Sequence, residues 1–313
     1  MKRPLLVVAG PTGVGKTAMA VALARRIPLE VISADSRQVY RGMDVATGKP
    51  TPQERLAVPH HLVDVVNPDE RYHAARFRAE AARLIEEIAG RGRLPVVVGG
   101  TGFYIRALLR GLDPAPPADL ELRRALESEA ARLGRPSLWA RLDREAPAVA
   151  RRLHPNDTVR IIRALERLHG AGGVATELVR WRQTRAADYD AVWIGLTMDR
   201  VALRRRLGAR AAAMVAAGLA HEVRGLLARG YDADLPSMQG LGYREFVQVV
   251  GGTLDEAEAL RRMQRDTMRY AKRQWTWFAR EPDVQWLDVE LAGGPEGAAE
   301  LVERRLRQGG LIG

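Results

Sequence analysis

The chain has 313 residues, 46% of them hydrophobic, so it can bury a sizeable core and is not a disordered polypeptide. It contains no cysteine, which excludes disulfides, a thiolate nucleophile and cysteine-ligated metal centres. The formal net charge of +11 is carried mainly by arginine, because only four residues are lysine, and it favours a polyanionic partner.

Short apolar runs alternate with helical patterns through the N-terminal third. Such runs predict buried strands at residues 5–9, 30–33 and 94–98, and later ones at 192–196 and 284–287. Helices are predicted over residues 17–26 and 72–88. Continuous apolar strands separated by helices predict an α/β fold with a parallel sheet covered on both faces.

The strand pattern is absent between residues 114 and 185. A proline-rich stretch at 113–119 is typical of a hinge, and the segment after it is helical in pattern and rich in arginine. We therefore predict a small helical domain, residues 114–185, inserted into a core made of residues 1–113 and 186–313. The alternative is a longer helical excursion packed on a single domain.

Residues 260–281 carry a net charge of +5 and interleave basic with aromatic side chains. Arg262, Arg265, Arg269 and Arg273 recur at a spacing that places them on one side of a helix. Such a helix can follow a phosphate backbone. It can equally be a core helix that buries its aromatic face and exposes a basic one.

The N-terminus shows no targeting signal. The apolar run at residues 5–9 is too short for the core of a signal peptide, and no apolar run approaches the roughly 18 residues of a membrane span. Together with the lack of cysteine, this predicts a cytoplasmic protein without a membrane partner.

The segment GPTGVGKT matches the phosphate-loop pattern G-x-x-x-x-G-K-[ST] and lies between a predicted strand and a predicted helix. Backbone N–H groups at a helix N-terminus would face a phosphate. Lys16 would place its charge on the terminal phosphate, and Thr17 would ligate Mg²⁺. The predicted phosphate-binding residues are Gly10, Pro11, Thr12, Gly13, Val14, Gly15, Lys16 and Thr17.

Two other strand ends should meet the same crevice. Asp35 follows the second strand, where it would hold Mg²⁺, act as a general base or cap a short helix. Thr101 follows the third strand beside two glycines, which indicates either close approach of a ligand or a plain turn. A long basic insertion, and the lack of an apolar run ending in D-x-x-G, argue against an ordinary nucleotide kinase.

Seven segments in order resemble the tRNA dimethylallyltransferases. They are GPTGVGKT, ISADSRQVYRGMDVATGKP, PHHLVDVVNP, VVVGGTGFYIRALL, HPNDTVRIIRALE, MQGLGYRE and RYAKRQWTWF. The resemblance covers nearly the whole chain and implies a P-loop NTPase-like core. It also implies transfer of a dimethylallyl group from its diphosphate to the exocyclic N6 amine of the adenosine just 3′ of the anticodon. The lack of cysteine resembles the bacterial form, because eukaryotic members add a zinc finger.

The resemblance also implies residue roles. Asp35 would be the base, Lys16 with Mg²⁺ would take up the charge of the leaving diphosphate, and Thr101 would hydrogen-bond the target nucleotide. Arg224 would be a second diphosphate ligand, unless it is an exposed helix arginine. The residues implied in tRNA binding are Asp35, Ser36, Arg37, Gln38, Thr101, Arg123, Val159, Arg160, Ile161, Ile162, Arg163, Gln239, Gly242, Tyr243 and Arg244.

The implied partners are the tRNA anticodon stem-loop, whose target base would have to be flipped out, and dimethylallyl diphosphate. We expect a monomer, since one site per chain needs no second copy. Two alternatives remain open at this stage. They are a P-loop nucleotide or small-molecule kinase, and a non-catalytic RNA-binding P-loop protein.

Overall fold

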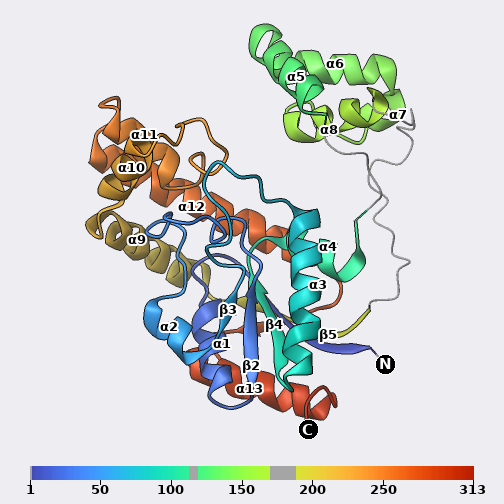
Figure 1. Ribbon diagram of the computed structural model, residues 1–313, viewed down its shortest axis with the longest axis vertical. Helices are drawn as coiled ribbons and strands as arrows, with labels where there is room; N and C mark the ends of the chain where they lie inside the picture. The colour runs from blue at the N-terminus through green and yellow to red at the C-terminus, as the bar shows by residue number, and fades with distance from the viewer. Residues whose placement is uncertain (1, 113–118, 170–187) are drawn as a thin grey trace. The chain divides into compact units, whose positions relative to one another are not determined.

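The computed structural model describes residues 2–112, 119–169 and 188–313 (Figure 1). The chain divides into two compact units, Met1–Leu109 with Ala186–Gly313, and Arg110–Arg185. The predicted domain boundaries, at 113/114 and 185/186, lie outside the described residues. Each unit is therefore considered by itself.

The larger unit is built on a parallel sheet of six strands within the described ranges, in the order β3-β2-β4-β1-β5-β6. The strands are β1 (Arg3–Ala9), β2 (Leu29–Ser33), β3 (His60–His61), β4 (Leu94–Gly99), β5 (Tyr189–Thr197) and β6 (Val284–Asp288). The predicted α/β class and its five strands are confirmed. The sixth, β3, has two residues, too few for any periodicity to show in the sequence.

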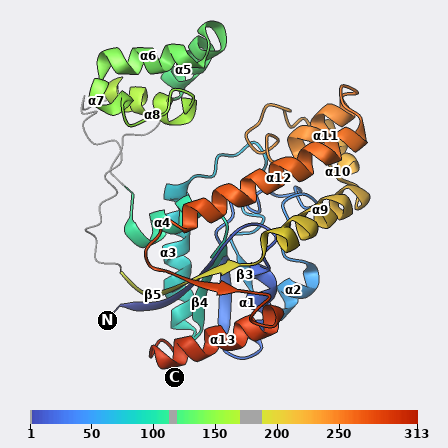
Figure 2. The same cartoon turned by 180° about the vertical axis from the view of Figure 1, so that it is seen from behind.

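Helices cover both faces of this sheet (Figures 1 and 2). They are α1 (Lys16–Ala24), α2 (Pro52–Ala57), α3 (Ala74–Gly90), α4 (Gly102–Arg110), α9 (Arg200–Ala216), α10 (Leu219–Ala228), α11 (Tyr243–Val250), α12 (Glu256–Phe278) and α13 (Gly294–Gln308). Alternate residues of β1 point to opposite faces, so Leu6 and Val8 share one core cluster with α1 and α13. Trp193 of β5 lies outside that cluster and packs edge-to-face with Phe278 of α12, with the ring centroids 6.3 Å apart.

The basic segment at 260–281 forms most of α12, as predicted. Its apolar side is buried through residues such as Met263, Ala271 and Phe278. Arg265 and Arg269 are exposed on the other side. The helix is thus a core element with a basic outer face, and contact of that face with RNA stays a prediction.

The smaller unit is helical, with α5 (Leu120–Leu133), α6 (Arg135–Glu145), α7 (Pro147–Ala150) and α8 (Thr158–His169). It has its own core, in which Leu126, Leu138, Leu142, Ile161 and Leu165 are fully or almost fully buried. An inserted helical unit with a core of its own agrees with the predicted fold class.

No single helix in the described ranges is long and apolar enough to cross a membrane. Helices α9 and α10 meet that test of length and composition only as a pair, which is bent by 54°.

Candidate active site

The phosphate loop joins β1 to α1 through glycines that no other residue can replace without strain. Gly10 has φ +143°, and a Cβ there would lie 2.5 Å from the carbonyl oxygen of Leu196. Gly15 has φ +108° and begins α1. The loop and the first turn of α1 line a cavity of about 380 Å³ at the carboxyl edge of the sheet. Its wall includes Gly13, Gly15, Lys16 and Thr17.

Lys16 lies folded back over this loop. Its Nζ donates hydrogen bonds to the carbonyl oxygens of Gly10 at 3.0 Å and Pro11 at 2.9 Å. Burial lowers the pKa of Lys16 to about 8, against the opposing attraction of Asp35, and the nearby Arg210 lowers it further. Among the described residues, the hydrogen-bond partners of this ammonium are these two carbonyl oxygens, which an anion in the cavity can replace.

The ends of β2 and β4 are joined so that Asp35 and Thr101 come together. The N–H of Thr101 donates to the carbonyl oxygen of Ala34 at 3.1 Å, and its Oγ1 accepts from the N–H of Ser36 at 3.0 Å. Gly99 allows this approach, because a Cβ there would lie 2.1 Å from the Ala34 oxygen. The structure thus brings the two predicted residues to one place.

The Asp35 side chain closes a local turn, and the residue also lines the cavity. Its Oδ1 accepts from the N–H of Arg37 at 2.8 Å, the turn that the sequence left open as a cap. The residue also lines the cavity, as do the phosphate loop and Gly99. Thr101 is not among the residues of the cavity wall, and its hydrogen bonds go to Ala34 and Ser36, on either side of the wall residue Asp35.

Two arginines of α9 line the cavity and were not predicted. Arg206 and Arg210 are one helical turn apart, and a Cβ on Gly15 of the phosphate loop would lie 3.9 Å from both Nη atoms of Arg206. Burial lowers the pKa of Arg210, opposed by Asp35 and reinforced by Arg206. Within the described part of the chain, Arg210 has no hydrogen-bond or ion-pair partner. A half-buried guanidinium that carboxylates reach only at longer range, without a direct ion pair among the described residues, indicates an anion-binding site.

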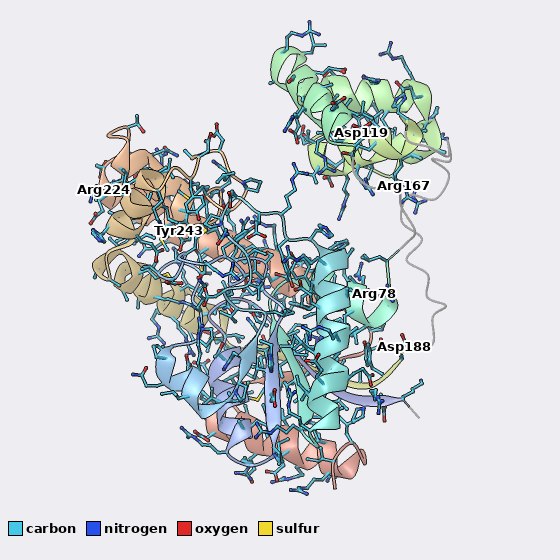
Figure 3. The ribbon with its side chains drawn as sticks, viewed as in Figure 1. Arg78, Asp119, Arg167, Asp188, Arg224 and Tyr243 are labelled. Atoms are coloured by element: carbon cyan, nitrogen blue, oxygen red, sulfur yellow. The ribbon has the colours of Figure 1, made fainter. Side chains whose placement is uncertain are left out.

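Arg224, expected as a second diphosphate ligand, is not brought to the cavity. It is exposed on α10 (Figure 3), where its side chain is not among those that line the wall. In the sequence, the four-residue spacing of Arg206 and Arg210 places both on one side of a helix. An exposed basic helix shows the same spacing, so only the position of α9 in the structure identifies them as cavity residues.

Comparisons with known proteins agree with this geometry. The family model described as IPP transferase matches residues 38–281, and one described as isopentenyl transferase matches residues 4–63. A tRNA dimethylallyltransferase of Anaeromyxobacter dehalogenans is 50% identical over 301 residues, which is 96% of this chain and 99% of that protein. The chain belongs to the tRNA dimethylallyltransferase family.

Solved structures extend the likeness to three dimensions. The tRNA isopentenylpyrophosphate transferase of Bacillus halodurans aligns with a TM-score of 0.68 and 38% identity, covering 96% of this chain and all of that one. A eukaryotic dimethylallyltransferase, described as acting on tRNA, aligns with a TM-score of 0.75 and 30% identity, covering 91% and 73%. The P-loop-like α/β fold is that of the family.

Two segments expected to meet tRNA lie side by side in this family member. Arg37 donates through Nη1 to the carbonyl oxygen of Pro236 at 2.7 Å, which joins residues 35–38 to the turn before α11. At the start of α11, Arg244 is held by Asp266 at 2.6 Å. Tyr243 is buried and donates to Glu222 at 2.7 Å (Figure 3), so its ring is part of the core.

The residues expected to grip tRNA on the helical unit differ in their exposure. Arg123 and Arg163 both bind Glu166, at 2.7 Å and 2.9 Å, and the side chain of Glu166 is 1% exposed. Ile161 and Ile162 are buried in the unit's core, so their side chains do not offer a surface. Val159 and Arg160 are exposed. A tRNA-binding role for these residues stays a prediction.

Proposed function

We propose that this chain transfers a dimethylallyl group from dimethylallyl diphosphate to the N6 amine of the adenosine 3′-adjacent to the anticodon of a tRNA. The observation that carries the proposal is the combination of the cations Lys16 and Arg210 with the Asp35 carboxylate among the wall residues of a single cavity built around a phosphate loop. Family membership supplies the reaction class. The cavity supplies a place for its diphosphate.

In the proposed reaction, the C1–O bond of the allylic diphosphate breaks and its electron pair leaves with the diphosphate. The N6 lone pair forms the new C1–N bond, and the displaced N6 proton passes to the Asp35 carboxylate. An adenine amine is a weak nucleophile because its lone pair is delocalised into the ring. A base beside it therefore favours bond formation, while Lys16 and Arg210 stabilise the charge on the leaving group.

Mg²⁺ fits the same arrangement as a partner of the diphosphate. In the described ranges, no group of three His, Cys, Asp or Glu side chains could hold a metal by itself. Thr17 lines the cavity directly after Lys16, and a hydroxyl with substrate phosphate oxygens and water is a usual Mg²⁺ shell. Bound there, the ion would add Lewis-acid stabilisation of the leaving diphosphate.

The tRNA anticodon stem-loop is the proposed acceptor, reached through residues 35–38 and the turn at 239–244. The helical unit, with a basic surface that includes Arg160, is proposed to hold the stem by phosphate contacts. We propose that it acts as a monomer, since one site per chain needs no second copy. We propose that it acts in the cytoplasm, where its tRNA substrate is made.

One experiment separates this function from the alternatives. The protein is incubated with unmodified tRNA, Mg²⁺ and labelled dimethylallyl diphosphate, and the tRNA is digested to nucleosides. Label in N6-dimethylallyladenosine is expected. Absence of label from RNA, with phosphoryl transfer from γ-labelled ATP to a small acceptor, would make the chain a kinase. Absence of both, with tRNA still bound, would make it a non-catalytic RNA-binding protein.

A further inference from the structure

The first turn of α4 carries an exposed aromatic residue that has no role in the proposed reaction. Phe103 follows Thr101 by two residues and is 45% exposed. The next residue, Tyr104, is only 5% exposed, and its ring stacks on Phe77 of α3 with the centroids 4.8 Å apart. Tyr104 therefore holds the helix in the core, while much of the Phe103 side chain stays open to an outside partner.

The start of α4 is fixed to the rest of the site from two directions. Oγ1 of Thr101 accepts from the N–H of Ser36 at 3.0 Å, which ties the turn before α4 to the segment after β2. Arg106 lies over the Trp277 ring at 4.3 Å and donates from Nε to Glu281 at 2.8 Å, which ties α4 to the end of α12. The exposed ring is thus carried at a set place beside the Thr101 turn.

The side of α4 that carries this ring is also basic. Phe103, Arg106 and Arg110 recur at i, i+3 and i+7, so they share one side of the helix, and the other sides are mostly buried. Exposed rings beside arginines are typical of surfaces that bind single-stranded nucleic acid, where the ring stacks on a base and the guanidinium attracts phosphate. Residue 110 also begins the helical unit, residues 110–185, which is proposed to hold the tRNA stem.

The proposed reaction creates a need for such a ring. The target adenosine has to leave the stack of the anticodon loop before its N6 amine can reach Asp35. Its two neighbours in the loop each lose a stacking partner when it does. An aromatic ring two residues after Thr101 offers a new partner to one of them, and it does so for any base because every base has a π-face.

We propose that Phe103 stacks on a base that neighbours the target adenosine and so holds the anticodon loop with its target flipped towards Asp35. This inference rests on the proposed function, since it takes a tRNA as the acceptor. It goes beyond that function by adding an apolar stacking contact on α4 to the polar segments at 35–38 and 239–244.

The test is a double-mutant cycle between the protein and an anticodon stem-loop RNA. The protein change is Phe103→Leu, which keeps an apolar side chain and removes the ring. The RNA change is an abasic nucleotide, placed in one RNA 5′ and in a second RNA 3′ of the target. Dissociation constants are measured by fluorescence anisotropy, with inorganic diphosphate and Mg²⁺ present.

Phe103→Leu is expected to weaken binding of the intact stem-loop by about tenfold, the loss of one stacked base. One of the two abasic RNAs should bind the parent protein equally weakly. The protein and RNA changes together should then lose no more than either alone, within about twofold, because they remove the same contact. Phe103→Trp should restore the affinity, since its ring also stacks.

Trp275→Leu is the matched control. Trp275 is another exposed aromatic residue, 40% exposed on α12, where it packs against Trp286 with the centroids 6.2 Å apart. This variant should bind the stem-loop as the parent does. The melting temperature and diphosphate affinity of Phe103→Leu should also match those of the parent, which separates a stacking contact from a structural one.

Four results would each overturn the inference. They are an unchanged stem-loop affinity in Phe103→Leu, additive losses with both abasic RNAs, an equal loss in Trp275→Leu, and a matching loss of diphosphate affinity in Phe103→Leu. Prenyl transfer by the parent is assayed separately. A parent that shows the stacking but transfers no prenyl group would count against the proposed function alone. Transfer by a parent whose affinity does not depend on Phe103 would count against this inference alone.

Discussion

Gln274 of α12 accepts a hydrogen bond from the backbone N–H of Thr12 at 2.8 Å, which ties the basic helix to the phosphate loop. Its Nε2 donates to the carbonyl oxygen of Gly100 at 2.9 Å, on the turn that carries Thr101. One buried amide thus joins the loop after β1 to the loop after β4. Helix α12 is therefore part of the site's framework, whatever its outer face binds.

The first prediction follows from this amide. Gln274→Met keeps the side-chain length but leaves the Thr12 N–H and the Gly100 carbonyl without their partner, at a cost of about 1–3 kcal/mol each if they stay dry. We expect diphosphate binding to weaken by roughly tenfold, with a lowered melting temperature. Calorimetry and thermal unfolding measure the two effects. Gln248→Met, at a residue outside the cavity wall, should change neither.

The second prediction concerns the base. Asp35→Asn should lower the single-turnover rate of prenyl transfer by about 10²–10⁴, the usual contribution of a general base, and leave tRNA affinity nearly unchanged. Rapid-quench kinetics and a tRNA binding isotherm separate the two quantities. Asp234→Asn, at an exposed aspartate outside the cavity wall, is the control. A matching loss of tRNA affinity would make Asp35 a recognition residue instead.

The third prediction separates two arginines that the sequence does not tell apart. Arg210→Ala should weaken binding of dimethylallyl diphosphate by tenfold or more, because it removes a half-buried cation from the cavity. Arg224→Ala should leave that affinity within twofold, since the side chain is exposed on α10. Both constants come from calorimetry without tRNA. Equal losses would mean that the cavity is not the diphosphate site.

The contrast between Arg210 and Arg224 shows which site residues can be predicted from the sequence. The phosphate loop and Asp35 were predictable because contiguous residues, or a residue directly after a strand, define them. Arg210 was not, because its place depends on how α9 packs after β5. That packing includes a hydrogen bond of 3.1 Å from Gln264 of α12 to the carbonyl oxygen of Gly208, between segments far apart in sequence. Tertiary packing alone distinguishes a cavity arginine from a surface one.

The fourth prediction is a pH dependence from Lys16, whose pKa burial lowers to about 8. Only the protonated ammonium attracts diphosphate, so affinity should be flat below about pH 7. It should fall as the pH rises through 8, by at most tenfold per unit. Diphosphate binding is measured from pH 6.5 to 9.5. Lys16→Arg stays charged across this range and should lack the fall at 8, which separates titration of the protein from titration of the ligand.

The helical unit gives a structural expectation beside its proposed contact with tRNA. Glu166 is almost fully buried and holds both Arg123 and Arg163, so these arginines stabilise the unit as well as carrying positive charge. An Arg123→Ala loss of tRNA binding would therefore mix two causes. Replacement of Arg160 tests tRNA contact with little effect on stability, because its side chain is 70% exposed and its ion pair with Asp157 is long, at 3.3 Å.

The fifth prediction uses this difference. If Arg160 contacts a tRNA phosphate, Arg160→Ala should reduce the slope of log affinity against log salt by about 0.7–0.9, the counterion release of one contact. The slope is obtained from tRNA binding at several salt concentrations, and unfolding should be almost unchanged. Arg304→Ala is the matched control, since Arg304 of α13 is also exposed and pairs with Glu300 at 3.2 Å. An equal slope change in both variants would reflect net charge rather than a contact, and an unchanged slope in Arg160→Ala would remove that residue from the interface.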